Sequence, residues 1–184
     1  MALTPSNMLP LGTKAPKFNL IDTKDNQLKS LSSLKGDNGT LVMFICNHCP
    51  FVIHINKQLV QLANDFALKG ISTIAISSND AVNYPQDGPE FMHTHAKANH
   101  YPFPYLYDET QEIAKAYDAA CTPDFFLFNG NLELVYTGEL DQSRPGNGIP
   151  VTGIDLRHAM NALVENRSIN SGQKPSMGCN IKWK

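Results

Sequence analysis

The chain lacks the features that mark several protein classes. No apolar run approaches the ~20 residues that a membrane-spanning helix needs, and no repeat or low-complexity segment occurs. Residues 1–8 contain no basic segment followed by an apolar core, the pattern of a secretory signal. A formal net charge of −2 over 184 residues offers no basic surface for nucleic acid or an anionic membrane. We therefore expect a cytoplasmic protein with neither kind of partner, long enough for one domain with a sizeable core.

Cysteine is also scarce, and its placement is informative. The four cysteines are Cys46, Cys49, Cys121 and Cys179, and only the first two are close in sequence. Thiols in the cytosol are mostly kept reduced, so a Cys-x-x-Cys pair there is more often catalytic than structural. The cysteine pattern therefore indicates a redox dithiol rather than a scaffold of disulfides.

The Cys-x-x-Cys pair follows an apolar run, Thr40–Ile45, and precedes a segment with apolar residues at helical spacing through Phe66. This pattern predicts a buried strand, a turn with two thiols and an amphipathic helix. Placed at the helix start, Cys46 would be a stabilised thiolate, because unpaired N–H groups and the positive end of the helix dipole meet there. We expect its pKa to lie below the ~8.5 of free cysteine. Cys49, one turn later, could reach back to form a disulfide.

Two other interpretations of the pair were weighed. A structural zinc site needs four ligands and usually a second closely spaced pair. The remaining cysteines and the nearby His48 and His54 do not provide one. Two inert buried thiols are a further alternative, since cysteine behaves as a small hydrophobe, but the position between a strand and a helix argues against it. We expect no bound metal.

The rest of the chain alternates between predicted strands and helices. The expected elements are strand 71–77, helix 89–99, strand 102–107, helix 108–117, strand 124–128 with a return strand 132–136, and a final helix ending near 164. A strand, helix, strand succession implies a parallel pair with a right-handed crossover. Asn79 and Asp80 follow the second strand and could rim the site, because ligands bind at the carboxyl ends of such strands. The Thr122–Pro123 bond is a candidate cis peptide.

The order of these elements and motifs resembles the thioredoxin fold. In more detail the chain looks like a redoxin of the alkyl hydroperoxide reductase/thiol-specific antioxidant superfamily, in a subgroup with a Cys-Asn-His-Cys-Pro motif. The matching segments are 11–18, 44–52, 77–80, 84–87, 121–127 and 176–184. The resemblance implies an α/β fold with a central mixed sheet flanked by helices and a redoxin-type N-terminal extension. It implies one domain over residues 1–184, with 168–184 as an extended tail.

The resemblance also implies roles for individual residues. Cys46 would be the attacking thiolate, and Cys49, the more buried of the two, would resolve the mixed disulfide. Asn47 and His48 would tune the potential, and cis-Pro123, preceded by Thr122, would present backbone to a substrate strand. The partners would be protein or small-molecule disulfides and a thiol reductant, and no bound cofactor is required.

The sequence departs from the related families in two places. Thioredoxin has a buried carboxylate on the central strand, whereas Thr40–Ile45 contains no acid, so proton handling must differ. Peroxiredoxins carry Pro-x-x-x-Thr-x-x-Cys, which matches neither Cys46 nor Cys49. This mismatch favours a thiol–disulfide oxidoreductase over a thiol peroxidase.

Several alternatives stay open. A peroxidase would use Cys46 as the peroxidatic thiol, with Cys49, Cys121 or Cys179 resolving it. A redox-sensing or metal-carrying binding module is the non-enzymatic alternative. Cys121 is either a packed neighbour of the pair, which we favour, or a third exchanging thiol. Cys179, expected on a mobile tail, is a candidate resolving thiol within the chain or across a homodimer.

Overall fold

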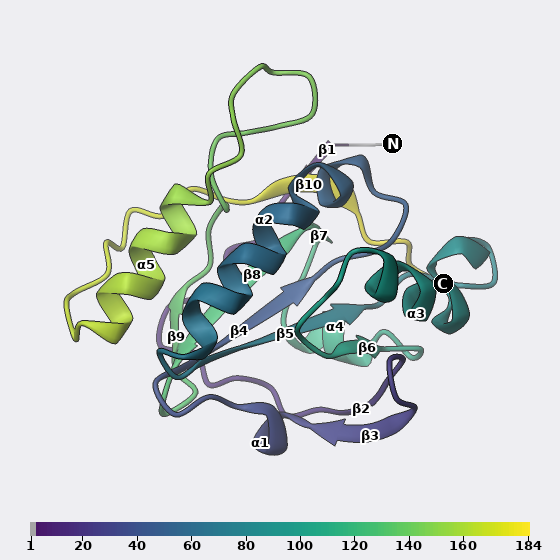
Figure 1. Ribbon diagram of the computed structural model, residues 1–184, viewed down its shortest axis with the longest axis horizontal. Helices are drawn as coiled ribbons and strands as arrows, with labels where there is room; N and C mark the ends of the chain where they lie inside the picture. The colour runs from purple at the N-terminus through teal and green to yellow at the C-terminus, as the bar shows by residue number, and fades with distance from the viewer. Residues whose placement is uncertain (1–2) are drawn as a thin grey trace.

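The computed structural model describes residues 3–184, and its centre is a seven-stranded mixed sheet (Figure 1). The strands, in sheet order, are β3 (Gln27–Ser30), β2 (Asn19–Asp22), β6 (Tyr105–Tyr107), β5 (Ile71–Ser77), β4 (Gly39–Phe44), β8 (Asp124–Asn129) and β9 (Leu134–Tyr136). Strands β4, β5 and β6 are mutually parallel, and every other pairing in this sheet is antiparallel. The sequence prediction of a central mixed sheet is therefore confirmed.

Helices cover both faces of this sheet. They are α1 (Leu31–Leu34), α2 (Pro50–Ala67), α3 (Pro89–Ala98), α4 (Glu112–Ala116) and α5 (Ile154–Val164), with a 3₁₀ turn, η1 (Pro85–Asp87), before α3. Core residues of α2, α3 and α5 form one cluster, and those of α1 and α4 belong to the other. Within residues 3–184, no helix is long and apolar enough to cross a bilayer.

Strand β4 contributes to both cores, as its neighbours β5 and β8 also do. All six of its residues are buried, and successive side chains of a strand point to opposite faces. Leu41 and Met43 thus join the cluster under α2, while Val42 and Phe44 join the cluster on the other face. The apolar stripe of α2 seals the first cluster over the sheet. This packing fixes the carboxyl end of β4, and with it the segment that carries Cys46 and Cys49.

A second, smaller sheet was not expected from the sequence. It has the order β1 (Leu3–Pro5), β10 (Met177–Asn180), β7 (Cys121–Thr122), with antiparallel pairing throughout. The C-terminal segment 168–184, expected to be an extended tail, thus runs back across the molecule and contributes its central strand. Gly178 permits the close approach, because a Cβ there would lie 2.0 Å from the Thr122 carbonyl oxygen. Figure 1 shows β10 crossing beside the N-terminal end of α2.

Candidate active site

The two thiols of the Cys-x-x-Cys motif lie where β4 ends and α2 begins. Helix α2 begins at Pro50 and its N-cap residue is Cys49, so the prediction that Cys46 stands at the helix start is wrong. The physical reason is Pro50: proline disfavours the helical conformation in the residue before it, and Cys49 is extended, with φ −69° and ψ 121°. The backbone N–H groups of Asn47 and His48 point instead at the Asp87 carboxylate, at 2.9 and 3.4 Å. Proline at the first helical position then fixes the start of the helix.

Both thiols are buried against Thr122, the residue that precedes the proline. The Thr122–Pro123 peptide bond is cis, as the sequence predicted. Cys46 Sγ lies 3.5 Å from Thr122 Oγ1, and Cys49 Sγ lies 3.2 Å from the Thr122 carbonyl oxygen. The exposed fractions are 1% for Cys46 and 0% for Cys49. The structure thus brings together Cys46, Cys49, Thr122 and Pro123, and it buries the two thiols almost equally.

The negative charge of the pair is placed on Cys49. A hydrogen bond from Cys46 lowers the pKa of Cys49 to about 5, assisted by Cys179 and by the backbone N–H of Val52 in the first turn of α2. The same hydrogen bond, together with burial and the nearby Asp87 charge, raises the pKa of Cys46 well above that of free cysteine. The sequence predicted a lowered pKa at Cys46. The correction follows mainly from the hydrogen bond within the pair, which Cys46 donates and Cys49 accepts.

Asp87 is the residue that the sequence analysis missed. Its side chain is fully buried and comes from η1, about forty residues from the thiols along the chain. Besides the Asn47 N–H, the carboxylate accepts a hydrogen bond from Asn79 Nδ2 at 2.8 Å, and His48 Nδ1 lies 2.6 Å away. The buried acid absent from β4 is therefore supplied by a loop. The only signal for it was the 84–87 segment of the family resemblance.

The two residues between the cysteines are held by this loop and by a neighbouring strand. Asn47 accepts a hydrogen bond from Tyr105 Oη at 3.0 Å and donates to the Gln86 carbonyl oxygen at 2.8 Å. The His48 ring stacks on Tyr84, with centroids 5.7 Å apart and planes within 5°. Of the two residues expected to rim the site, Asn79 contacts Asp87. Asp80 instead accepts from Val82 N at 2.9 Å within its own loop.

One group of side chains has donor atoms suited to a metal ion. In the part of the chain that the structure describes, the ligand atoms of Cys46, His48 and Asp87 lie within 4.8 Å of one another. Three donors are one short of a closed tetrahedral zinc site, and the Asp87 carboxylate is already engaged by protein donors. The set is thus better matched to proton handling at Cys46 than to metal binding.

The remaining cysteines lie in the small sheet. Cys121 in β7 is fully buried, its Sγ contacts the Pro123 and Ser176 carbonyl oxygens, and burial raises its pKa. These contacts fit the packing role that we favoured. Cys179 lies in β10 rather than on a mobile tail, is 2% exposed, and its Sγ is 2.9 Å from Cys49 Sγ. Its side chain therefore belongs to the thiol cluster.

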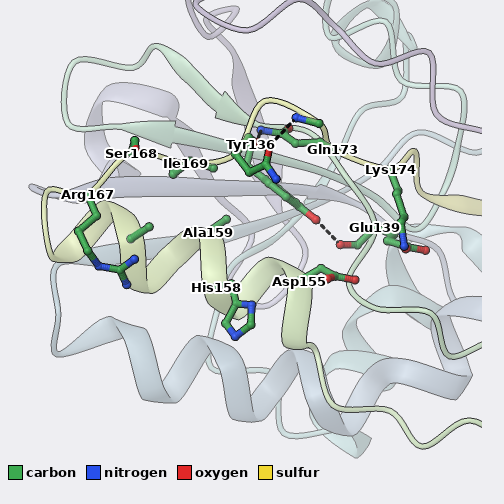
Figure 2. Close-up of a pocket in the computed structure, with 13 residues that line it drawn as sticks. Tyr136, Glu139, Asp155, His158, Ala159, Arg167, Ser168, Ile169, Gln173 and Lys174 are labelled. Atoms are coloured by element: carbon green, nitrogen blue, oxygen red, sulfur yellow. Dashed lines mark hydrogen bonds between the residues drawn. The ribbon is translucent and has the colours of Figure 1, made fainter.

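The thiol cluster is closed to large molecules. The cavity that Pro123 lines, with Phe51 and Met177 among the other walls, has a volume of about 20 Å³. A cavity of about 610 Å³ lies elsewhere, between α5 and the 167–174 segment, and Figure 2 shows His158 and Asp155 of α5 along its edge. None of the four cysteines lines that larger pocket, so open space and thiol chemistry are separated in this fold.

The family model described as the AhpC/TSA family matches residues 11–137. The chain belongs to the AhpC/TSA family. A crystal structure of an uncharacterized conserved protein from Geobacillus kaustophilus is 58% identical, with a TM-score of 0.98 and coverage of 100% of this chain and 97% of that one. A hypothetical protein from Sinorhizobium meliloti 1021 is 47% identical, with a TM-score of 0.96 and 98% of each chain covered.

More distant structures define the fold of this AhpC/TSA-family chain. A protein from Chlorobium tepidum, described as a putative thiol:disulfide interchange protein DsbE, is 17% identical with a TM-score of 0.66. The alignment covers 85% of this chain and 99% of that one, and at this identity it shows the shared thioredoxin-like fold alone. Among curated proteins, none matches the chain.

Proposed function

We propose that this protein is a thiol–disulfide oxidoreductase whose redox group is the Cys46–Cys49 pair. The observation that carries the proposal is the placement of two buried thiols, spaced as Cys-x-x-Cys, beside cis-Pro123 and in contact with Thr122. The hydrogen bond from Cys46 lowers the pKa of Cys49 to about 5. A thiolate at neutral pH is the species that exchanges with a disulfide. The AhpC/TSA family and the structural relative described as a thiol:disulfide interchange protein support the same class of chemistry.

The reaction begins with a proton transfer inside the pair. Cys46 passes its proton to the Cys49 thiolate and attacks one sulfur of the substrate disulfide. The Cys46 mixed disulfide forms, and the leaving thiolate takes a proton from Cys49. Cys49, again a thiolate, then attacks the Cys46 sulfur and releases the second substrate thiolate, which leaves a Cys46–Cys49 disulfide. A thiol reductant returns the pair to its starting state.

Cys46 is proposed as the attacking sulfur because Cys49 is held by contacts with a second thiol and with a backbone oxygen. Cys49 Sγ contacts the Thr122 carbonyl oxygen and Cys179 Sγ, and it shares a proton with Cys46. Asp87 and His48 lie on the Cys46 side of the pair. Asp87 holds the backbone of Asn47 and His48 beside Cys46 through their N–H groups, while the proton for the departing thiolate comes from Cys49.

A thiol peroxidase is the second candidate, and the burial of the thiols is the observation that favours it. Hydrogen peroxide is small enough to approach a thiol that is 1% exposed while β10 stays in place, whereas a protein disulfide requires β10 to move. In that reaction Cys46 becomes a sulfenic acid with release of water, and Cys49 attacks it to form the same disulfide with release of a second water.

Stopped-flow mixing of the reduced protein with insulin and, separately, with hydrogen peroxide tests the two candidates. The product of each reaction is mapped by mass spectrometry. We expect fast reduction of insulin disulfides, slow reaction with peroxide, and a Cys46–Cys49 bridge in the product. Cys46→Ser and Cys49→Ser should abolish insulin reduction, while Cys121→Ser serves as a buried control. Peroxide reaction far faster than that of an ordinary thiolate of the same pKa would establish the peroxidase instead.

A further inference from the structure

Cys179 is held against the Cys-x-x-Cys pair by strand pairing on both sides. In β10 it stands opposite Leu3 of β1 and opposite Thr122 of β7, the residue before cis-Pro123. Its Sγ lies 2.9 Å from Cys49 Sγ, about 0.9 Å beyond the length of an S–S bond. The two sulfurs come from positions 130 residues apart in sequence, so the fold itself has brought a third thiol to the pair.

We propose that Cys179 is a third redox-active cysteine, whose thiolate displaces Cys46 from the Cys46–Cys49 disulfide and forms a Cys49–Cys179 disulfide. The inference deepens the proposed function and rests on its Cys46–Cys49 disulfide. The Cys179 thiolate attacks Cys49 Sγ, the Cys49–Cys179 bond forms, and the Cys46–Cys49 bond breaks with its electron pair on Cys46. The proton that Cys179 loses is taken up by Cys46. The step is an exchange within one chain, so no external oxidant or reductant is consumed.

The contacts of Cys49 make it the sulfur that the two others share. It interacts with Cys46 and with Cys179, whereas Cys121, on the neighbouring strand, directs its Sγ at the carbonyl oxygens of Pro123 and Ser176. In the reduced protein, burial and the adjacent Cys49 charge raise the pKa of Cys179 to about 12. Once Cys49 is part of a disulfide, it carries no negative charge that would raise the pKa of Cys179. Lys182 still lowers that pKa. Oxidation of the pair thus prepares Cys179 to attack.

The exchange has two consequences for the site. Cys46 returns to the thiol form while the chain remains oxidised, so it is again available to a substrate small enough to reach it with β10 in place. The new disulfide also ties β10 to the start of α2, next to cis-Pro123. A strand that now rests on β7 through hydrogen bonds would then be covalently attached.

Disulfide mapping after oxidation distinguishes the possible bridges, because trypsin separates the cysteines. Cleavage places Cys46 and Cys49 together in peptide 36–57, Cys179 in 168–182 and Cys121 in 116–157. Wild type, Cys46→Ser, Cys179→Ser and Cys121→Ser are oxidised with diamide, quenched in acid, alkylated and digested. Far-UV circular dichroism confirms that each variant is folded, and Cys46→Ala replaces Cys46→Ser if the serine variant is not.

In the Cys46 variant we expect most of the protein to carry peptide 36–57 linked to peptide 168–182. Wild type should show this link beside the internal bridge of peptide 36–57, and Cys121→Ser should match wild type. No link in the Cys46 variant, or a link from 36–57 to 116–157, overturns the inference. The variant Cys179→Ser tests the proposed function separately: if it forms no internal Cys46–Cys49 bridge, the proposed dithiol itself is refuted, whatever Cys179 does.

Discussion

Replacement of Asp124 by asparagine should stabilise the protein at neutral and alkaline pH. Asp124 follows cis-Pro123 in β8, is fully buried, and burial raises its pKa from 3.8 to about 7. The unfolded chain ionises near pH 4, whereas the folded protein holds the proton up to about pH 7. Between these values the folded state binds more protons than the unfolded state, so the free energy of unfolding falls as pH rises.

The size of the expected stability gain follows from the pKa shift of Asp124. Each pKa unit corresponds to 1.36 kcal/mol, so a shift of about three units costs at most about 4 kcal/mol at pH 8 and nothing below pH 4. Asparagine removes this cost and can keep the local hydrogen bonds. Its oxygen can accept from the Ala120 N–H, now 3.2 Å from Asp124 Oδ2, and its amide can donate to the Ser6 hydroxyl. We therefore expect a gain of about 2 to 4 kcal/mol at pH 8.

Urea denaturation of both proteins at pH 4 and pH 8 measures the difference. Asp108→Asn is the matched control, since that buried carboxylate accepts hydrogen bonds from Ser78 Oγ and Ala114 N and should lose stability at pH 8. A variant Asp124→Asn that is no more stable than wild type at pH 8, or that gains equally at pH 4, would refute the argument.

Three further substitutions test the environment of the thiols. Asp87→Asn removes a buried negative charge and should lower the pKa of Cys46, measured as the pH dependence of its alkylation. Gly178→Val places a side chain against the Thr122 carbonyl oxygen and should displace β10, so that Cys49 alkylates at least about tenfold faster because its cover is lost. Tyr105→Phe removes the hydrogen bond to Asn47 and should cost about 1 kcal/mol in urea denaturation.

Each of these tests has a control and a contrary outcome. Asp80→Asn, a buried acid of the same loop, should leave alkylation of Cys46 unchanged; an equal effect of both variants would contradict a specific role for Asp87. Gly172→Ala, on the exposed approach to β10, should leave Cys49 protected, and protection that survives Gly178→Val would mean that β10 is not its cover. Tyr107→Phe controls for loss of a hydroxyl from the same strand; equal costs would argue against the Asn47 contact.

The parts of the fold that could be predicted are those whose signal is local. Strand β4 is predictable from its apolar run and helix α2 from its helical spacing, because each element buries its own side chains. The effect of Pro50 on the start of α2 is local, whereas the contact of Asn47 with Asp87 could not be predicted, since Asp87 is contributed by a distant loop. β10 could not be read either, because Met177–Asn180 is short, contains a glycine and carries no periodic pattern. Its conformation is set by pairing with β1, near the start of the chain, and with β7, in the second half of the chain.

The same distinction limits what the sequence could say about the site. Cys46, Cys49, Thr122 and Pro123 belong to motifs with a fixed place in the fold, so their convergence could be expected. The place of the charge within the pair could not, because it depends on the hydrogen bond within the pair and on where Asp87 lies. At Cys179 the sequence showed only a lone cysteine near the end of the chain, so its contact with Cys49 could not be predicted.

The position of β10 decides which substrates can reach the thiols. Peptides that add a strand to a sheet pair with its edge, and an extended substrate would do so at β7 beside cis-Pro123. In this fold β10 already pairs with that edge of β7. The adjoining cavity of about 20 Å³ holds roughly one water molecule. A protein disulfide therefore requires β10 to move, whereas a peroxide does not. A Cys49–Cys179 disulfide would hold β10 in place and exclude large substrates until it is reduced, so the redox state of Cys179 and the size of the accepted substrate are linked through one strand.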